Sequence, residues 1–410
     1  MRQKEDIILR SFYYISNGKM HRFSEGKATE LSSGVLQSYI SKVKDSAERN
    51  EWKYNGSGAA FTGVYQNRAS ATDAVSSIYS QVNCVGEYMG DLFYSLDIDS
   101  TNGLYRRTEG IANEGIVLCS SSNAYRDFDI KGNLLVTSSH FAGESHIGIL
   151  NLDTKSFNLY TEGHCRDFSP TWSAVSADKV YFCSAGLPEN DRRDPEDEAP
   201  RGISQMVNEM YSSARSAKQG PTAICVLDVT AATLDELLTD PRYDYTHPQP
   251  TFDGSLYYIR KPYRSGKSAA DSLGCFVDAL MLPIRLIEAL FGFLNVFSAK
   301  YSGKTLARSD VKQRDEKEMF IDGNLINAEK ELRDNQRRGD KNPGIIPHSW
   351  ELRRREPNGN DTLIRKGVAA FRVDEKTGDI LLSNGSAILL LDKEGREEKL
   401  LAAEGVTFIK

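Results

Sequence analysis

Short runs in which apolar and polar residues alternate recur along the chain, separated by turns rich in Gly, Asp, Asn or Lys. Three similar copies read YRDFDIKGNLLVTSS (residues 125–139), CRDFSPTWSAVSADKVYFCSAG (165–186) and YDYTHPQPTFDGSLYYIRKP (243–262). Alternation places successive side chains on opposite faces of a strand, so each copy predicts two strands joined by a turn. The chain is therefore expected to be all-β.

The copies are spaced as units of a repeat. Asp127 and Asp167 occupy equivalent positions, and 167 − 127 gives 40 residues. A period of about 40 residues is typical of β-propellers, whose units are four-stranded blades. Residues 368–401 supply four strand-like runs, the content of one blade. We predict a single closed β-propeller over residues 1–410, with helical insertions.

The two ends of the chain complement each other. Residues 12–33 contain three strand-like runs, and residues 405–410 contain one more. Pairing the last strand with the first three would close the ring and cover exposed strand edges. This gives six blades, and residues 34–81 provide room for a seventh, although they also carry a helical apolar pattern. Seven blades is the preferred count, with six as the alternative.

Two insertions interrupt the strands. Residues 188–220 begin with a run of mixed charge and predict a solvated loop. Residues 265–347 are long enough for a helical lobe, and Ile321, Leu325, Ala328 and Leu332 have one-face helical spacing there. Earlier in this insertion, residues 273–299 predict an amphipathic helix whose apolar surface consists of Phe276, Leu280, Leu286, Ile287, Leu290, Phe291, Leu294 and Phe297.

Three roles remain open for residues 273–299. The helix could pack on the propeller, dock to a protein partner, or lie in a membrane surface as a peripheral contact. Its charges, which include Arg285 and Glu288, argue against a membrane-spanning helix.

Charge and composition exclude some classes of partner and indicate the cellular compartment. The formal net charge is -6, which offers no basic field for a nucleic acid. None of the six cysteines forms a CxxC pair, and the N-terminus has no uninterrupted apolar signal segment. We expect a cytoplasmic protein with reduced cysteines, with membrane association left open through residues 273–299.

Motifs for catalysis are missing from the sequence. RSGKS (264–268) and YSGKT (301–305) lack the leading glycine of a phosphate-binding loop, and no G-x-S-x-G pentapeptide occurs. His140 and His146 flank a turn that contains Glu144, and we interpret them as exposed loop histidines rather than metal ligands. The sequence therefore predicts no catalytic residue, no metal and no cofactor.

Three aspartates recur at equivalent positions of the repeats: Asp127, Asp167 and Asp244. If they border a central channel, their charge could bind a cation or a basic peptide. The alternative is that each carboxylate caps a turn by accepting backbone N–H bonds, a role needed once per repeat.

The phrases FSPTWS, KVYFCSAG and HPQPTFDGSLYYIRKP resemble the repeats of TolB-like and WD-repeat-like bacterial propellers. NGSGAAF, LPIRLIEALFGFLNVFSAKYSGK and ILLSNGSAILLLD are also similar to propeller proteins of gene systems that include a MoxR-type ATPase and von Willebrand A domain proteins. The resemblance implies a non-catalytic scaffold or adaptor for protein–protein interaction beside an ATPase. The alternative is a propeller-based hydrolase or lyase with a central carboxylate-lined pocket.

Overall fold

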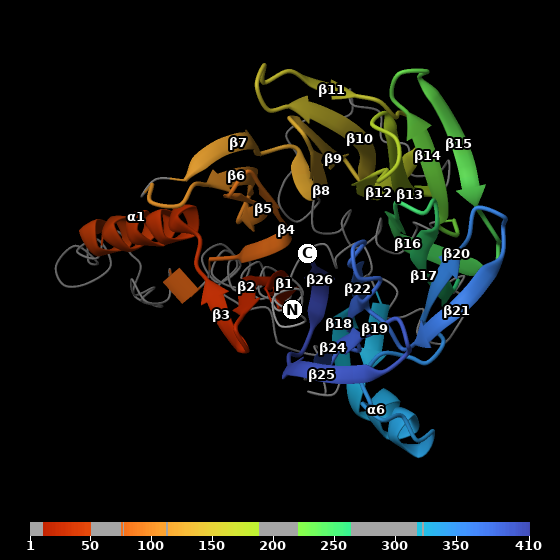
Figure 1. The fold of residues 1–410 in the computed structure, drawn as a ribbon. Helices are drawn as coiled ribbons and strands as arrows, with labels where there is room; N and C mark the ends of the chain where they lie inside the picture. The colour runs from red at the N-terminus through yellow and green to blue at the C-terminus, as the bar shows by residue number, and fades with distance from the viewer. Residues whose placement is uncertain are drawn as a thin grey trace, which may run out of the picture.

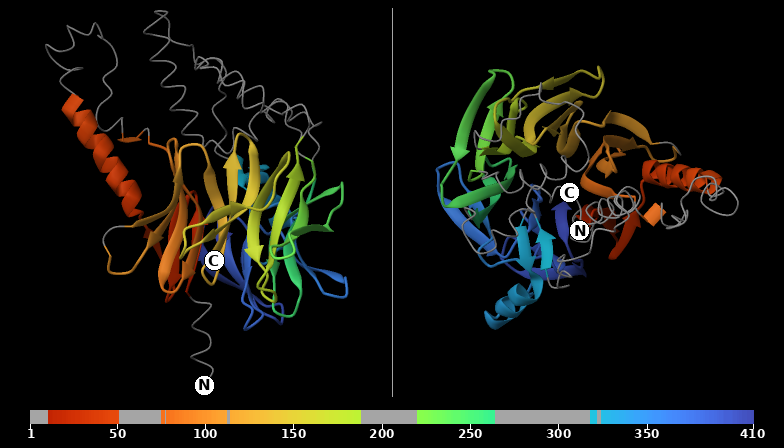
Figure 2. Two further views of the ribbon diagram at one scale, coloured as in Figure 1. Left: turned by 90° about the horizontal axis from the view of Figure 1, so that it is seen from above. Right: turned by 180° about the vertical axis from the view of Figure 1, so that it is seen from behind.

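The computed structural model describes residues 11–50, 75–76, 78–111, 114–187, 220–263, 318–321 and 324–410. Most of these residues lie in antiparallel strands, and the sheets are arranged around a common centre, as the blades of a β-propeller are (Figure 1). In the side view of Figure 2, the strands run between two opposite faces of this arrangement.

The first two sheets have four strands each. Sheet 1 has the order β26-β1-β2-β3, with β26 (Val406–Ile409), β1 (Phe12–Ser16), β2 (Lys19–Ser24) and β3 (Lys27–Leu31). Helix α1 (Gly34–Asn50) follows β3. Sheet 2 contains β4 (Ser80–Tyr88), β5 (Asp91–Ile98), β6 (Thr101–Arg107) and β7 (Gly115–Ser120).

Sheet 3 consists of two four-stranded halves. The first half contains β8 (Ala124–Lys131), β9 (Leu134–Phe141), β10 (Glu144–Asn151) and β11 (Phe157–Leu159). The second contains β12 (Cys165–Trp172), β13 (Lys179–Gly186), β14 (Ala223–Asp228) and β15 (Thr233–Leu238). A parallel contact between β10 and β12, with Ser145 opposite Arg166, joins the halves.

The remaining strands form two further four-stranded sheets and a hairpin. Sheet 4 contains β16 (Tyr243–Pro250), β17 (Leu256–Pro262), β20 (Glu351–Arg355) and β21 (Asp361–Lys366). Sheet 5 contains β22 (Ala370–Val373), β23 (Ile380–Ser383), β24 (Ala387–Leu391) and β25 (Glu397–Ala402). The hairpin of β18 (Glu318–Ile321) and β19 (Asn324–Asn327) leads into α6 (Ala328–Arg337), whose first turn is capped by the Asn327 side chain.

Tight hairpins keep the strands in register. Met89 and Gly90 form the two-residue connection between β4 and β5, with φ of 53° and 82°. Two-residue turns with positive φ at both positions match the right-handed twist of paired strands, and glycine adopts that conformation at no steric cost. Ala142 and Gly143 repeat the arrangement between β9 and β10, with φ of 50° and 92°.

The core lies between neighbouring sheets. Phe93 and Leu104 of sheet 2 are buried against Phe128 and Leu135 of sheet 3. The second half of sheet 3 packs on sheet 4 in the same way, through Ile224, Leu238, Tyr245, Leu256 and Tyr258. Because neighbouring sheets cover both of its faces, an inner strand such as β5 is buried along its whole length, whereas the outer strands β3 and β15 are largely exposed.

The ends of the described chain meet in sheet 1. Strand β26 pairs antiparallel with β1, with Tyr14 opposite Ile409, and Tyr13 and Lys410 exchange two backbone hydrogen bonds of 2.9 Å. This is the pairing that the complementary ends of the sequence suggest.

The innermost strands all end on one face. Asp129, near the end of β8, accepts a hydrogen bond from the N–H of Trp172, the last residue of β12, and contacts Lys410, which follows β26. Gln249, near the end of β16, bonds to Val373, the last residue of β22. We call this the C-face, and the face at which these strands begin the N-face.

Several sequence expectations change or lie outside the described residues. Within 34–81, residues 34–50 form α1, as the helical pattern predicts, and residues 51–74 lie outside the described part. Ile321 and Leu325 belong to strands β18 and β19 rather than to a helix, because Asp322–Gly323 between them favours a hairpin turn.

Residues 188–219 of the first insertion and 265–317 of the second, including the predicted helix 273–299, lie outside the described residues. Among the described helices, none is long and apolar enough to cross a membrane.

Candidate functional site

The three equivalent aspartates lie on innermost strands, and two of them, Asp127 and Asp244, accept backbone N–H bonds. Asp127 of β8 accepts a hydrogen bond from the N–H of Ser169 at 3.1 Å, and Asp244 of β16 accepts one from Thr222 at 2.9 Å. Both bonds join neighbouring four-stranded units. Asp127 and Asp244 thus accept backbone N–H bonds, as in the capping alternative. The N–H group belongs to the neighbouring unit, however, and not to a turn next to the aspartate.

Asp167 differs from the other two because it is buried among side chains. Its carboxylate accepts hydrogen bonds from the hydroxyls of Thr161 (2.6 Å) and Ser184 (2.7 Å). Burial raises the pKa of Asp167 above its ordinary value, while the two hydroxyls, Cys165 and His146 act in the opposite direction. The carboxylate is therefore held in a fixed orientation in a poorly solvated place.

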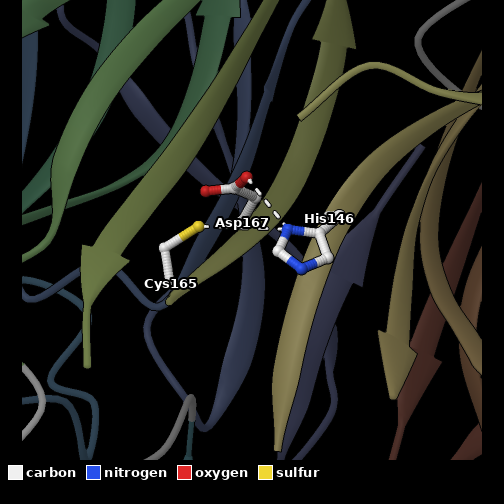
Figure 3. A group of neighbouring side chains, drawn as sticks. All are labelled: His146, Cys165 and Asp167. Atoms are coloured by element: carbon white, nitrogen blue, oxygen red, sulfur yellow. Dashed lines mark hydrogen bonds and ion pairs between the residues drawn. The ribbon is translucent and has the colours of Figure 1, made fainter. Parts of the chain in front are cut away.

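His146 and Cys165 complete a cluster with Asp167. The Nδ1 atom of His146 lies 4.0 Å from the Asp167 Oδ2 atom and 4.0 Å from the Cys165 Sγ atom. One donor atom from each of the three residues lies within 4.8 Å of the others. Figure 3 shows the three side chains pointing toward one another from β10 and β12.

The contact between β10 and β12 explains why these residues meet. Ser145 lies opposite Arg166, and side chains alternate along a strand. The neighbours of that pair, His146 on one strand and Cys165 and Asp167 on the other, therefore share a side. The Ser145 hydroxyl fixes the approach by donating to the backbone carbonyl of Asp167 at 2.9 Å.

Glu144 forms the outer part of the cluster. Its Oε1 atom lies 2.6 Å from Nδ1 of His164, and its Oε2 atom lies 3.6 Å from Nε2 of His146. Glu144 begins β10 and Cys165 begins β12, so the cluster lies at the N-face. A carboxylate, an imidazole nitrogen and a thiol sulfur that converge in this way can hold a metal ion.

Cys165 beside His146 is also the residue pair of a nucleophilic site, but the pKa of its thiol argues against that role. Burial and the charge of Asp167 raise the pKa of the Cys165 thiol to about 12. At neutral pH the sulfur keeps its proton, and the thiolate is the reactive form. Without a bound cation, the thiol is therefore a poor nucleophile.

Our interpretation of His140 and His146 as exposed loop histidines is wrong. His140 lies in β9 and His146 in β10, and both are partly buried. The turn between these strands is only Ala142–Gly143, so both histidines belong to the sheet. Burial, together with Arg126 and Arg166, lowers the pKa of His140 to about 3, and its Nε2 atom lies 3.1 Å from the Ser138 hydroxyl.

The sequence indicates Asp167 as a candidate and places Glu144 near His146. It does not single out Cys165 or His164, and a cysteine next to a strand normally packs as a small apolar residue. Their adjacency in the sequence HCRD was the available signal.

The C-face carries a different set of features. A small cleft near the centre is lined by Gly86, Glu87, Phe128, Asp129, Ile130 and Lys410. Four turns at this face expose large apolar side chains: Met89 (84% exposed), Ile111 (59%), Val175 (66%) and Phe252 (69%).

Comparisons with known proteins give similarity of fold only. No protein-family model and no curated protein matches the chain. Similar solved structures include TolB from Acinetobacter baumannii, with a TM-score of 0.45 and 7% identity over 97% of this chain and 65% of that chain. The tricorn protease has a TM-score of 0.42 and 8% identity over 96% of this chain and 34% of that chain.

An oligogalacturonate lyase from Vibrio parahaemolyticus is a third, with a TM-score of 0.37 and 11% identity over 78% of this chain and 79% of that chain. This chain thus spans about a third of the protease chain and just under two thirds of the TolB chain. A TolB protein, a protease and a lyase all occur among the similar structures, so no single activity accompanies the similarity.

Proposed function

We propose that the chain is a closed six-bladed β-propeller that acts as a non-catalytic scaffold or adaptor, with the C-face as its partner-binding surface. The six blades are sheets 1, 2, 4 and 5 and the two halves of sheet 3, each with four strands. The pairing of β26 with β1 supports closure. Six blades use every described strand except the β18–β19 hairpin.

The observation that carries the proposal is the exposure of Met89, Ile111, Val175 and Phe252 at the tips of C-face turns. Single exposed apolar residues are common, but here four turns at the same face each present one. Large apolar side chains such as Met and Phe are enriched where proteins contact each other. The cleft between Glu87 and Lys410 adds charged groups of both signs to the same face.

The first partner to test is a MoxR-type ATPase, because the sequence resembles propeller proteins of gene systems that include one. Residues 273–299 lie outside the described part, and the amphipathic helix that their sequence predicts is a second candidate contact, to a protein or to a membrane. We place this activity in the cytoplasm.

The proposal predicts that the paired substitution Met89→Asp and Phe252→Asp abolishes co-purification of the ATPase with the full chain. Folding should be unaffected, since exposed substitutions usually change stability by less than about 0.5 kcal/mol. Met89 has a φ of 53°, a conformation that Asp tolerates well. The matched control is Phe141→Asp, at an N-face turn and 54% exposed, which should leave binding intact.

A photo-crosslinking residue placed at position 252 or at position 141 gives an independent readout. We expect adducts with the ATPase from position 252 and none from position 141. Binding that survives the double substitution, or adducts from the N-face position alone, would show that the C-face is not the partner surface.

A second candidate function, a hydrolase or lyase, is favoured by one observation: the buried Asp167 carboxyl with a raised pKa beside His146. Turnover of a glycoside, ester or uronide by the purified chain, abolished by Asp167→Asn, would replace the scaffold proposal with this one.

A further inference from the structure

We propose that Nδ1 of His146, Sγ of Cys165 and Oδ2 of Asp167 bind a divalent metal ion of the zinc class between β10 and β12. This site is separate from the proposed partner surface, because it lies at the N-face. Either proposal can therefore fail without the other.

The spacing of the three donor atoms is close to that of a tetrahedral site. Bond lengths of about 2.0 to 2.3 Å to zinc place neighbouring ligand atoms about 3.4 to 3.6 Å apart. The two distances from His146 Nδ1 are 4.0 Å, and all three atoms lie within 4.8 Å of one another. The donor atoms are thus slightly farther apart than in a bound site, and we infer that side-chain rotation brings them to bonding distance of one ion.

Side chains next to the three ligand residues can orient them for metal binding. A histidine that binds metal through one ring nitrogen usually donates the other N–H to a carboxylate. Glu144 lies 3.6 Å from Nε2 of His146, where a slight shift makes that bond. Asp167 is held by Thr161 and Ser184, and each carboxylate oxygen keeps a lone pair after accepting one hydrogen bond.

The donor set selects the kind of ion. Calcium and magnesium prefer oxygen ligands only, whereas a thiolate with an imidazole and a carboxylate suits zinc and similar ions. Binding removes the proton from Cys165, since the thiolate is the ligand. Three protein ligands leave a fourth position for water or another ligand, the arrangement of an open rather than a closed zinc site.

The test is titration of the purified full chain with Zn²⁺ by calorimetry, and with Co²⁺ by absorption spectroscopy. We expect one ion per chain. The cobalt form should show thiolate-to-metal charge transfer in the near ultraviolet and the visible bands of tetrahedral cobalt. Cys165→Ser should remove the charge-transfer band. It should also weaken zinc binding by more than the roughly 100-fold that loss of a supporting residue costs.

Two further variants make the result specific. Glu144→Gln should keep one ion per chain and lower the affinity about 10- to 100-fold. Cys119→Ser changes an exposed cysteine outside the cluster and should bind zinc as the unaltered chain does. The proposal is overturned if cobalt gives no thiolate band, or if Cys165→Ser, with an unchanged circular dichroism spectrum, binds zinc as tightly as Cys119→Ser.

Discussion

At the scale of single residues, the Gln249 side chain of sheet 4 makes two hydrogen bonds to the backbone of sheet 5, as a paired strand would do. Its side-chain amide donates to the carbonyl of Val373 at 3.0 Å and accepts from the same residue's N–H at 2.9 Å. A bulge that contains His247, with a φ of 57°, shifts the register of β16 just before this glutamine. The bulge thus turns a polar side chain toward the neighbouring sheet, where it satisfies two buried backbone groups.

Substitution Gln249→Leu keeps the approximate volume and leaves both backbone groups of Val373 unpaired. Each buried, unpaired group costs about 1 to 3 kcal/mol, so we expect a loss of at least about 2 kcal/mol in the free energy of unfolding. Urea unfolding measures the change. Gln37→Ala, at an exposed position of α1, is the control and should change stability little. Equal stability of the two variants would contradict this role for Gln249.

The sequence reveals residues of this kind only in part. The repeat exposes the equivalence of Asp127, Asp167 and Asp244, because they recur in similar phrases. It does not reveal their partners, since the N–H of Ser169 comes from a different four-stranded unit than Asp127. The meeting of His146 with Cys165 depends on a parallel contact between two units, which no local pattern encodes.

At the scale of elements, β26 is a short strand with a large share of buried contacts. Val406 and Ile409 are fully or almost fully buried. They pack with Phe12, Tyr14 and Phe23 of sheet 1 and with Ala370, Leu381 and Ile388 of sheet 5. The strand therefore joins two sheets that stand at opposite ends of the described sequence.

We expect Ile409→Ala to lower the free energy of unfolding by about 2 to 5 kcal/mol, the usual cost of emptying a buried aliphatic site. Thermal and urea unfolding measure the loss. Thr407→Ala, at an exposed position of the same strand, should cost far less. Deletion of residues 405–410 removes the whole pairing, and an unchanged melting temperature after that deletion would count against a structural role for β26.

Strands were easier to predict than the surrounding elements. Alternating patterns identify β8, β9, β12, β13, β16 and β17, because a period of two has few other interpretations. The secondary structure of residues 34–50 is ambiguous in the sequence. They carry apolar residues at helical spacing, but they also lie in a stretch long enough for an additional blade. Ile321 and Leu325 have helical spacing by chance, and the turn preference of Asp322–Gly323 outweighs it.

At the scale of the whole molecule, an ion pair joins three four-stranded units at the C-face. Nζ of Lys410 lies 2.6 Å from Oδ1 of Asp129, and Oδ2 of Asp129 accepts a hydrogen bond from the N–H of Trp172. Burial would raise the pKa of Asp129, but Lys410, Arg372 and the Trp172 N–H outweigh burial and lower it. The ionised carboxylate is therefore the form that the folded chain favours.

A lowered pKa in the folded chain stabilises the fold above the unfolded value of 3.8, and this contribution is lost as the pH falls through the folded pKa. Lys410→Met should therefore lower the free energy of unfolding by about 1 kcal/mol at pH 7. The difference from the unaltered chain should shrink in acid. Lys399→Met, at an exposed site, is the control. A difference that stays unchanged as the pH falls through the acid range would show that the ion pair is not its source.

Strand order in sheet 1 also has a consequence for synthesis on the ribosome. Translation makes β1, β2 and β3 before any other described strand, but their partner β26 last, with 406 − 31 = 375 positions between Leu31 and Val406. At about 5 to 20 residues per second, that interval lasts about 19 to 75 seconds. For that time the edge of β1 is open to pairing with another nascent chain. Production of intact protein therefore depends on how well the cell shields an unfinished sheet, and slower translation lengthens the period of risk.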